Sequence, residues 1–489
     1  MNLGRGTRTL DDEVKVRVNQ LSSLRNERRR QNVMQKRMAL LENHNPEIVI
    51  RETYPELKSM IIESFQNQNM ELLKSNLQKL YYFSTKTIDE NITVDFVNDI
   101  SQLLLPILQI QNLQRENLVF ILNILTNISS TNGNLHPFLT NGILDAMKYY
   151  AGIDDSEIIA MVLTFISNMI NESTEVMLFI FNAGFYEILI QLKDKVLSAV
   201  SLQNAYSWCF CNICRNVTFR NGDFIRNLIP LILLNNNTSE AALIDILWGI
   251  FILSKNIQQF GMLKELNVFE FIFKTMKLKN NRIYIPVLKI LETYAYEDEK
   301  YFDYFLQFDI FKWIKKVLLD PQLNELNYKS ICFILSNLVV STKFRKILCD
   351  EKVIEFLIHS YIKQSETIKT EIKYVIVNCF IGADDQEVFY LCQIDQIYTI
   401  FADFIEKDER LVELYLGALI KIDCVGQSCF GEEENQFLEK MKEAGVMSML
   451  EYYMHSQHIK ISEMATAFFN IFNESDKYQA EDWGMDLEM

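Results

Sequence analysis

Residues 125–130 read LTNISS, and a segment of this type, in which a hydrophobic helix ends in Ser/Thr-Asn-Ile/Leu, returns along the chain at nearly constant spacing. Its asparagine recurs as Asn127, Asn168, Asn212, Asn337 and Asn378. The same place falls at Ile252 and Thr293 in between, so the successive steps are 41, 44, 40, 41, 44 and 41 residues. A fixed period of this length predicts repeated units that bury their apolar faces by stacking on their neighbours.

A second element recurs about half a period later, where a short polar break precedes a new apolar helix. Breaks of this kind stand at 141–143, 183–185, 266–268 and 444–446. Apolar residues within a unit recur three and four positions apart, as Ile158, Val162 and Phe165 do, which is the spacing of one helix face. With 15 Gly and 7 Pro in 489 residues, the chain has few of the turns that an all-β fold needs. The period is that of armadillo and HEAT units, and we predict an all-α, right-handed superhelical solenoid of about ten armadillo repeats.

Composition excludes several classes of protein. No apolar run reaches the roughly 20 residues of a membrane span, and the N-terminus is polar and basic, so we expect an intracellular protein without a membrane partner. Nine cysteines, mostly on apolar helix faces, favour reduced thiols over a disulfide framework. Cys209, Cys211 and Cys214 form the tightest cluster, but their spacing on one helix predicts packing and not a zinc site.

Signatures of catalysis are missing from the sequence. It contains no glycine-rich phosphate loop, no His-Glu-x-x-His and no Gly-x-Ser-x-Gly. His455 and His458 stand three apart without a clear third metal ligand. We therefore expect no enzyme activity, no cofactor and no metal.

Charge is divided unevenly along the chain. Residues 1–45 carry 10 Lys/Arg and 5 Asp/Glu, a net charge of +5, which leaves a net charge of −21 for the remainder. Across a Debye length of about 10 Å, an acidic solenoid attracts basic segments, its own included, and repels nucleic acid. This pattern predicts basic protein partners and no direct nucleic-acid role.

The N-terminal residues resemble a known binding segment. Residues 24–38, LRNERRRQNVMQKRM, resemble the importin-β-binding segment of the importin α family, in which a Leu-Arg pair precedes two basic clusters. The repeats resemble the same family: residues 207–216, SWCFCNICRN, are similar to its fourth repeat and residues 245–248, DILW, to its fifth. The likeness continues into a ninth repeat at residues 416–421 and towards a tenth at residues 438–445.

The resemblance implies a groove in which Trp slots cover lysine stems, Asn clamps a peptide backbone and carboxylates face the ammonium groups. It implies a major groove that binds nuclear-localisation signals through Asn127, Asn168, Glu172, Trp208, Asn212, Asp245 and Trp248. It implies a minor groove made by Lys289, Phe333, Asn337, Glu371, Tyr374 and Asn378, with Thr293 in place of an Asn. It assigns importin-β binding and self-inhibition to Arg25, Arg28, Arg29, Arg30, Lys36 and Arg37. Only Trp208 stands four residues before an Asn, so the Trp ladder is less complete than the Asn ladder.

The function implied is that of a nuclear import adaptor that shuttles between cytoplasm and nucleus. Its partners would be importin β, cargo proteins with basic localisation signals, and the export receptor of the family. The predicted organisation is a flexible basic arm at 1–45, a linker at 46–54, the solenoid at 55–475 and an acidic tail at 476–489. Two alternatives stay open: an armadillo scaffold without transport activity, and a helical-repeat subunit of an enzyme complex.

Overall fold

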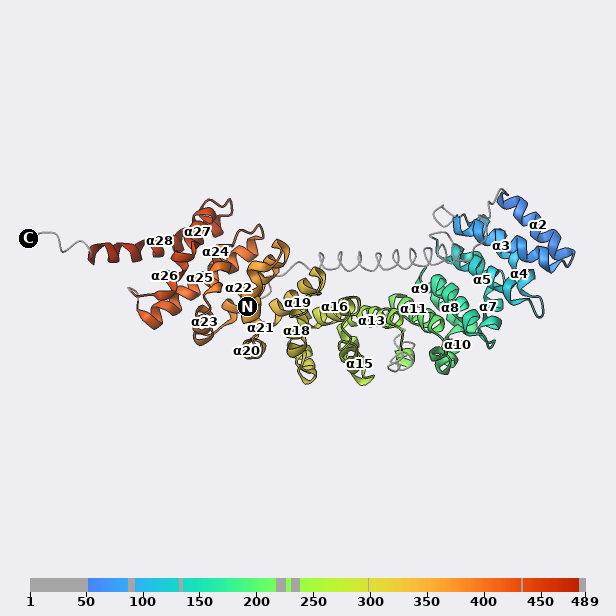
Figure 1. Ribbon diagram of the computed structural model, residues 1–489, viewed down its shortest axis with the longest axis horizontal. Helices are drawn as coiled ribbons and strands as arrows, with labels where there is room; N and C mark the ends of the chain where they lie inside the picture. The colour runs from blue at the N-terminus through green and yellow to red at the C-terminus, as the bar shows by residue number, and fades with distance from the viewer. Residues whose placement is uncertain are drawn as a thin grey trace, which may run out of the picture. The chain divides into compact units, whose positions relative to one another are not determined.

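The computed structural model describes residues 52–86, 93–131, 135–216, 226–229, 238–297, 299–431 and 434–482. The predicted basic arm and most of the predicted linker lie outside these residues, so the assignments of Arg25, Arg28, Arg29, Arg30, Lys36 and Arg37 stay predictions. The described residues are helical and contain no strand. They group into two compact units, one ending at Leu278 and the other beginning at Lys279 (Figure 1).

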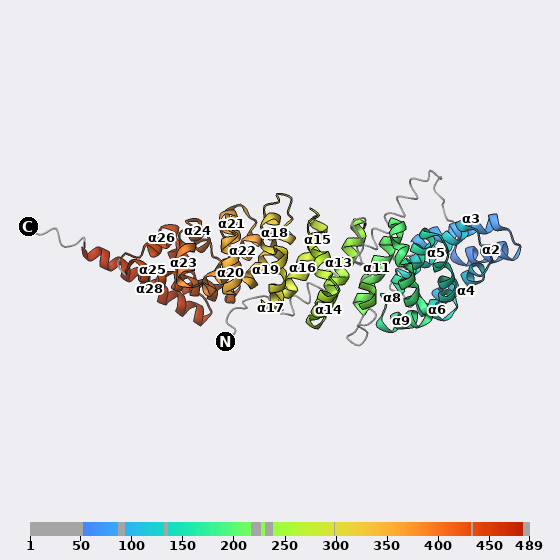
Figure 2. The same ribbon diagram turned by 90° about the horizontal axis from the view of Figure 1, so that it is seen from below.

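The unit that ends at Leu278 begins with four helices of 13 to 17 residues and continues with short helices between long ones (Figures 1 and 2). Its long helices pack on one another in sequence order, α3 on α5, α5 on α8, α8 on α11 and α11 on α13. The α-helices of this unit are α2 (Tyr54–Gln66), α3 (Met70–Lys86), α4 (Val94–Leu108), α5 (Arg115–Ser129), α6 (His136–Thr140), α7 (Ile143–Ala151), α8 (Ser156–Ile170), α9 (Thr174–Ile180), α10 (Tyr186–Gln191), α11 (Val200–Asn216), α13 (Glu240–Ser254), α14 (Phe260–Glu265) and α15 (Val268–Thr275).

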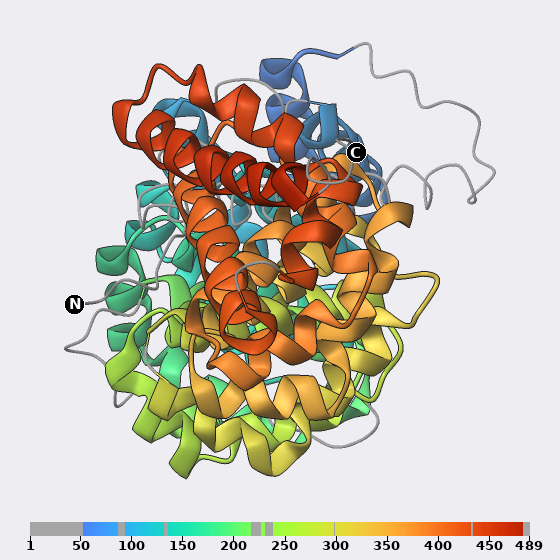
Figure 3. The ribbon, with the colours of Figure 1, turned by 90° about the vertical axis from the view of Figure 1, so that its left-hand side faces the viewer.

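The unit that begins at Lys279 repeats this plan. Its long helices also pack in order, α16 on α19, α19 on α22, α22 on α25 and α25 on α28, and the red helices at its C-terminal end lie nearest the viewer in Figure 3. The α-helices are α16 (Asn281–Glu297), α17 (Glu299–Asp303), α18 (Ile310–Leu318), α19 (Glu325–Leu338), α20 (Thr342–Asp350), α21 (Val353–Ser360), α22 (Glu366–Gly382), α23 (Asp385–Cys392), α24 (Gln396–Ala402), α25 (Glu409–Phe430), α26 (Gln436–Ala444), α27 (Val446–Met454) and α28 (Ile459–Asp482). Because α28 runs to Asp482, the predicted acidic tail begins as the end of the last helix.

Most repeats place one left-handed residue between their first two helices. Where the sequence shows Gly at the polar break, the backbone has a positive φ, as at Gly142 (φ 82°), Gly184 (φ 100°) and Gly445 (φ 93°). Asn267, Asp309 and Lys352 hold the equivalent turn with φ between 54° and 57°. An L-residue at such a φ carries a steric cost, which the surrounding helices must offset. The turn sets the direction of the second helix, and the long third helix then closes the repeat.

The segment Thr174–Asp194 differs from the prediction that no stretch is long and apolar enough to span a bilayer. It is a run of 21 helical residues, in which a window of 18 residues has a mean hydropathy of 1.4 and is one third buried. Gly184 interrupts its regular helical backbone. The part before the break, α9, packs on α8 and α11. The segment therefore supplies the first two helices of one repeat.

The cysteines lie as predicted. All nine are free thiols, and Cys209, Cys211 and Cys214 are buried on α11. Burial raises the pKa of the Cys209 thiol to about 12, as expected for a packed and unreactive side chain. Stacked helical repeats and the absence of strands from the described ranges confirm the all-α solenoid.

Candidate ligand-binding surface on the third helices

The predicted groove residues all lie on or directly after the long third helices. The first set belongs to the unit ending at Leu278: Asn127 is on α5, Asn168 on α8, Glu172 just beyond it, Trp208 and Asn212 on α11, and Asp245 and Trp248 on α13. The second set belongs to the other unit: Lys289 is on α16, Phe333 and Asn337 on α19, and Glu371, Tyr374 and Asn378 on α22. Each set thus occupies one row of third helices.

The regular spacing of the asparagines has a structural cause within the stack. The amide Nδ2 of Asn212, on α11, donates to the Ser167 hydroxyl (2.8 Å) and to the Ser167 carbonyl (3.1 Å) on α8. Asn127, on α5, donates in the same way to the Ser84 hydroxyl (2.9 Å) on α3. Both asparagine side chains are fully buried. An amide buried at a helix interface needs such partners, since an unpaired one costs about 1–3 kcal/mol.

The same link joins two further pairs of helices. Asn168 donates to the Ser129 hydroxyl (3.1 Å) of α5, and Asn378 donates to the Ser336 carbonyl (3.1 Å) of α19. In the ninth repeat Lys421 takes this place on α25 and donates to the Ile381 carbonyl of α22 (3.3 Å). The Ser/Thr-Asn pair therefore works as a brace, in which one repeat supplies the acceptor and the next repeat supplies the donor.

Three repeat positions lack this brace, and one of them, Ile252, has no polar side chain. Asn337 donates to the Phe333 carbonyl (2.8 Å) of its own helix α19, and the Thr293 hydroxyl donates to the Lys289 carbonyl (3.0 Å) of its own helix α16. The predicted role of the asparagines in clamping a peptide stays a prediction. The amide nitrogens of Asn127, Asn168, Asn212 and Asn378 already serve the neighbouring helix.

Trp208 is buried, with 7% of the residue exposed, and its ring is covered by a cation of the same chain. The Arg215 guanidinium lies 5.3 Å from the centre of the indole ring, which is within the range of a cation–π interaction. Arg215 Nη1 also donates to Oδ1 of Asn212 (3.0 Å) and to Oδ1 of Asn171 (3.2 Å). Arg215 had no role in the predicted groove, although its position seven residues after Trp208 places it two helical turns along α11.

The two predicted acids of the first set differ in environment. Asp245 is buried and accepts a long hydrogen bond from the Ser207 hydroxyl (3.5 Å). Glu172 is exposed, but nearby protein atoms remove part of its hydration and so raise its pKa. A backbone hydrogen bond from Leu135 and the charge of His136 act in the opposite direction and are weaker. Asp245 thus lies within the interface between α11 and α13, whereas Glu172 reaches the surface.

Trp248 packs within the stack. Only 4% of its side chain is exposed, and its ring meets Phe251 edge to face at a centroid distance of 5.5 Å. Its burial leaves little indole surface for a lysine stem. Of the two tryptophans in the predicted major groove, Trp208 is the one that an arginine side chain reaches.

The second set holds a buried ion pair at its first position. Lys289 Nζ lies 2.7 Å from both carboxylate oxygens of Glu292, and the two side chains are 12% and 8% exposed. Burial of two charges is tolerated here because the lysine is paired with both oxygens. The positive charge of Lys289, which stands where the resembling family has an arginine, is therefore neutralised by Glu292 of the same helix.

The remaining members of the second set lie on α19 and α22. Phe333 is 9% exposed and Glu371 is buried. The Tyr374 hydroxyl donates to Asp408, and burial together with this bond raises the pKa of Tyr374 well above its usual range. The loop after α24 thus reaches the N-terminal half of α22, where Lys373 also meets Glu406 at 3.0 Å. The tyrosine of this set is thus held by a neighbouring part of the chain.

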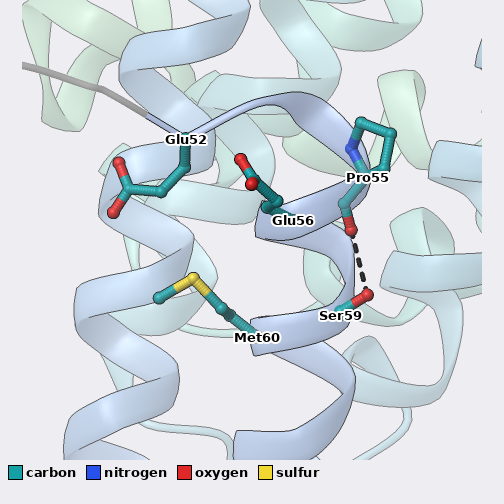
Figure 4. Close-up of a pocket in the computed structure, with 5 residues that line it drawn as sticks. All are labelled: Glu52, Pro55, Glu56, Ser59 and Met60. Atoms are coloured by element: carbon teal, nitrogen blue, oxygen red, sulfur yellow. Dashed lines mark hydrogen bonds between the residues drawn. The ribbon is translucent and has the colours of Figure 1, made fainter.

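An open pocket of about 530 Å³ lies elsewhere, at the start of the first described repeat (Figure 4). Glu52, Pro55, Glu56, Ser59 and Met60 line it. Glu52 is paired with Lys79 (2.5 Å), and the Glu56 carboxylate accepts from the backbone of Thr53 (2.7 Å). Both carboxylates are engaged in structural contacts. Among the described residues no group of three or more His, Cys, Asp or Glu could hold a metal ion.

Comparisons with known proteins bear on the fold. No protein-family model matches the sequence, and no curated protein matches it. Among solved structures, the chain is similar to an engineered protein with a TM-score of 0.63 and 13% identity, over 85% of this chain and 98% of that one. It is also similar to a chain from a study of the phosphorylation switch in the interaction between cadherin and beta-catenin, with a TM-score of 0.54 and 10% identity, over 91% of this chain and 96% of that one.

Designed armadillo repeat proteins are also among the similar structures. One was solved in complex with the peptide (KR)4 and has a TM-score of 0.43 and 17% identity, over 49% of this chain and 98% of that one. At identities of 13% and 10%, the likeness to the first two structures shows the solenoid fold alone.

Proposed function

We propose that the chain is a nuclear import adaptor, which holds a basic localisation peptide against its third helices and recruits importin β through its N-terminal basic segment. The observation that carries the proposal is the joint placement of Trp208 and Asn212 on α11 with Asp245 on the adjacent α13. An aromatic face with a cation already seated on it is a surface of the chemistry that a lysine or arginine side chain prefers. The N-terminal resemblance adds the second partner.

The experiment is calorimetric titration of the full-length protein with importin β and, separately, with a basic localisation peptide. The test variant is Arg29→Glu with Arg30→Glu, and the matched control is Arg5→Glu with Arg8→Glu, which changes the charge equally outside the resembling segment. We expect importin β to bind the wild type and the control at least tenfold more tightly than the test variant, because the lost contacts are charge-assisted. Equal affinity of all three proteins would refute the assignment of the arm.

A second candidate function is a protein-interaction scaffold without transport activity. It is favoured by the cations that the chain itself places in the predicted grooves, Arg215 over Trp208 and Lys289 against Glu292. A basic peptide would have to displace Arg215 from the indole, whereas a neutral or mixed partner need not. If neither importin β nor a basic peptide binds in the calorimetric titrations, the scaffold is the better description.

A further inference from the structure

We propose that one edge of the unit beginning at Lys279 binds the same edge of a second copy of this chain. The edge presents three aliphatic side chains, Leu319, Ile362 and Ile405, which are 57%, 62% and 57% exposed. They lie in three consecutive repeats, each just after the second helix of its repeat, and successive positions are 43 residues apart. These three residues define the aliphatic edge. The inference is independent of the proposed function.

The three loops of the aliphatic edge are joined side by side by hydrogen bonds. They follow α18, α21 and α24, which succeed one another along the unit in Figure 2. In the middle loop, the Ser365 hydroxyl donates to Glu325 at the start of α19, where the first loop ends (3.3 Å). The Tyr361 hydroxyl of the same loop donates to Asp403 in the third loop (2.8 Å). Since neighbouring packed helices lie about 8–10 Å apart, the three aliphatic side chains span about 20 Å.

Packing within each repeat keeps these aliphatic side chains in solvent. Each of them directly follows a buried residue, which is Leu318, Tyr361 or Phe404. The buried residue fills the space under the loop, so the residue after it has no place in the core. Single exposed aliphatic residues are common on protein surfaces. Three at one place in successive repeats form a surface that gains free energy when another apolar surface covers it.

The charges at the two ends of the aliphatic edge are opposite. Asp320 directly follows Leu319, and Lys407 lies two residues after Ile405. The other acids of the third loop are already bonded to the middle loop and to α22; they are Asp403, Glu406 and Asp408. An edge with opposite charges one repeat to either side of a central residue fits its own reversed copy, as a two-fold interface requires.

A two-fold axis at Ile362 brings both kinds of contact together. With the two edges antiparallel, the Ile362 side chains of the two copies meet at the axis, and the outer aliphatic side chains meet on either side of it. Asp320 of each copy then faces Lys407 of the other, so the dimer contains this ion pair twice. Near the axis, Lys363 of each copy lies opposite Glu366, whose side chain is 79% exposed. A parallel arrangement would instead set Asp320 against Asp320.

Sedimentation equilibrium of the full-length protein tests the dimer. The protein is measured from about 5 to about 500 µM. Dithiothreitol keeps the exposed thiols of Cys424 and Cys429 reduced. Because small interfaces belong to transient complexes, we expect a monomer–dimer equilibrium with a Kd of about 10–100 µM. Ile362→Ser should weaken dimerisation at least about tenfold, since it removes both aliphatic side chains at the axis. The matched control is Val200→Ser, which changes a residue that is 60% exposed in the other unit and should dimerise like the wild type.

Charge reversal tests the antiparallel arrangement. Asp320→Lys and Lys407→Asp should each weaken dimerisation about tenfold, because each substitution sets like charges against one another twice. Together they exchange the two charges, so the combined variant should dimerise within about threefold of the wild type. A protein that stays monomeric at about 500 µM would overturn the proposal. A dimer that Ile362→Ser leaves unchanged, or that the combined charge exchange does not restore, would overturn it as well.

Discussion

The brace between Asn212 and Ser167 offers a direct measurement of what the recurring asparagine does. In Asn212→Ala, Nδ2 is lost from the Ser167 hydroxyl and carbonyl, and Oδ1 is lost from Arg215. At a net value of about 0.5–1.5 kcal/mol for each hydrogen bond, the three contacts together predict a loss of about 1.5–4.5 kcal/mol. In Ser167→Ala only the hydroxyl contact is lost, so we expect a smaller loss of about 1 kcal/mol.

A double-mutant cycle isolates the link itself. A repeat protein of two compact units is not expected to unfold in a single two-state transition. The quantity to measure is therefore the local opening free energy of α8 and α11, by native-state hydrogen exchange. We expect the loss of opening free energy in the double variant to be about 1 kcal/mol smaller than the sum of the two single losses, because both single variants remove the same hydroxyl contact.

The matched control is Asn337→Ala, since Asn337 occupies the same repeat position but bonds its own helix. It should change the opening free energy of the preceding long helix by less than about 0.5 kcal/mol. Additive losses for Asn212→Ala and Ser167→Ala, within about 0.3 kcal/mol, would refute the reasoning that the asparagine links neighbouring repeats.

Three further outcomes follow from named contacts. Arg215→Gln keeps an amide donor for Asn212 but removes the cation from the indole of Trp208. If the proposed function holds, calorimetry should show that basic peptides bind the variant about two- to tenfold more tightly than the wild type. Weaker binding would contradict the proposed function. Arg345→Met deprives the Glu387 carboxylate of its buried partner and should cost about 3–5 kcal/mol, measured as the local opening free energy of α20 by hydrogen exchange, with a loss under about 1 kcal/mol counting against it. The hydrogen bond from Arg115 lowers the pKa of Asp155 below its ordinary value of 3.8 despite some burial, so this carboxylate stabilises the fold above pH 3.8 and loses that contribution as the pH falls through the lowered pKa. Asp155→Asn, which keeps a capping side chain on α8, should therefore lie below wild type in Tm at neutral pH and converge with it in acid; a constant gap would argue against the linkage.

The order of helices and turns could be predicted because the residues that mark each turn lie at the turn itself. Gly142, Gly184 and Gly445 marked the turn between first and second helices, since glycine adopts a positive φ without steric cost. Asp309 and Lys352 make the same turn and gave no such signal, because their left-handed backbone is imposed by the packing of the helices on either side. The repeats that contain them were found from the asparagine period instead.

The candidate surface was only partly predictable, and for a different reason. The period located Asn127, Asn168, Asn212 and Asn378, but not the direction in which their amides bond, since that depends on how closely the helices pack. Likewise, nothing in the spacing indicated that Arg215 would turn back over Trp208 or that Lys289 would be held by Glu292. Residues a few positions apart can occupy the side chains that a ligand would contact. Which side chains are occupied in this way depends on rotamers and packing that the sequence does not reveal.

The braces also give the stack a polarity. Helices α5, α8 and α22 each donate such a hydrogen bond to the repeat before and accept one from the repeat that follows, so the links run in one direction along each unit. Between two braced repeats, loss or duplication of one whole period would leave the donor facing an acceptor, whereas a cut at half a period would leave a buried amide opposite apolar side chains. Insertions and deletions between braced repeats are therefore expected in whole periods. A braced repeat could move to another place in the row, but it could not be reversed in direction without losing its hydrogen bonds.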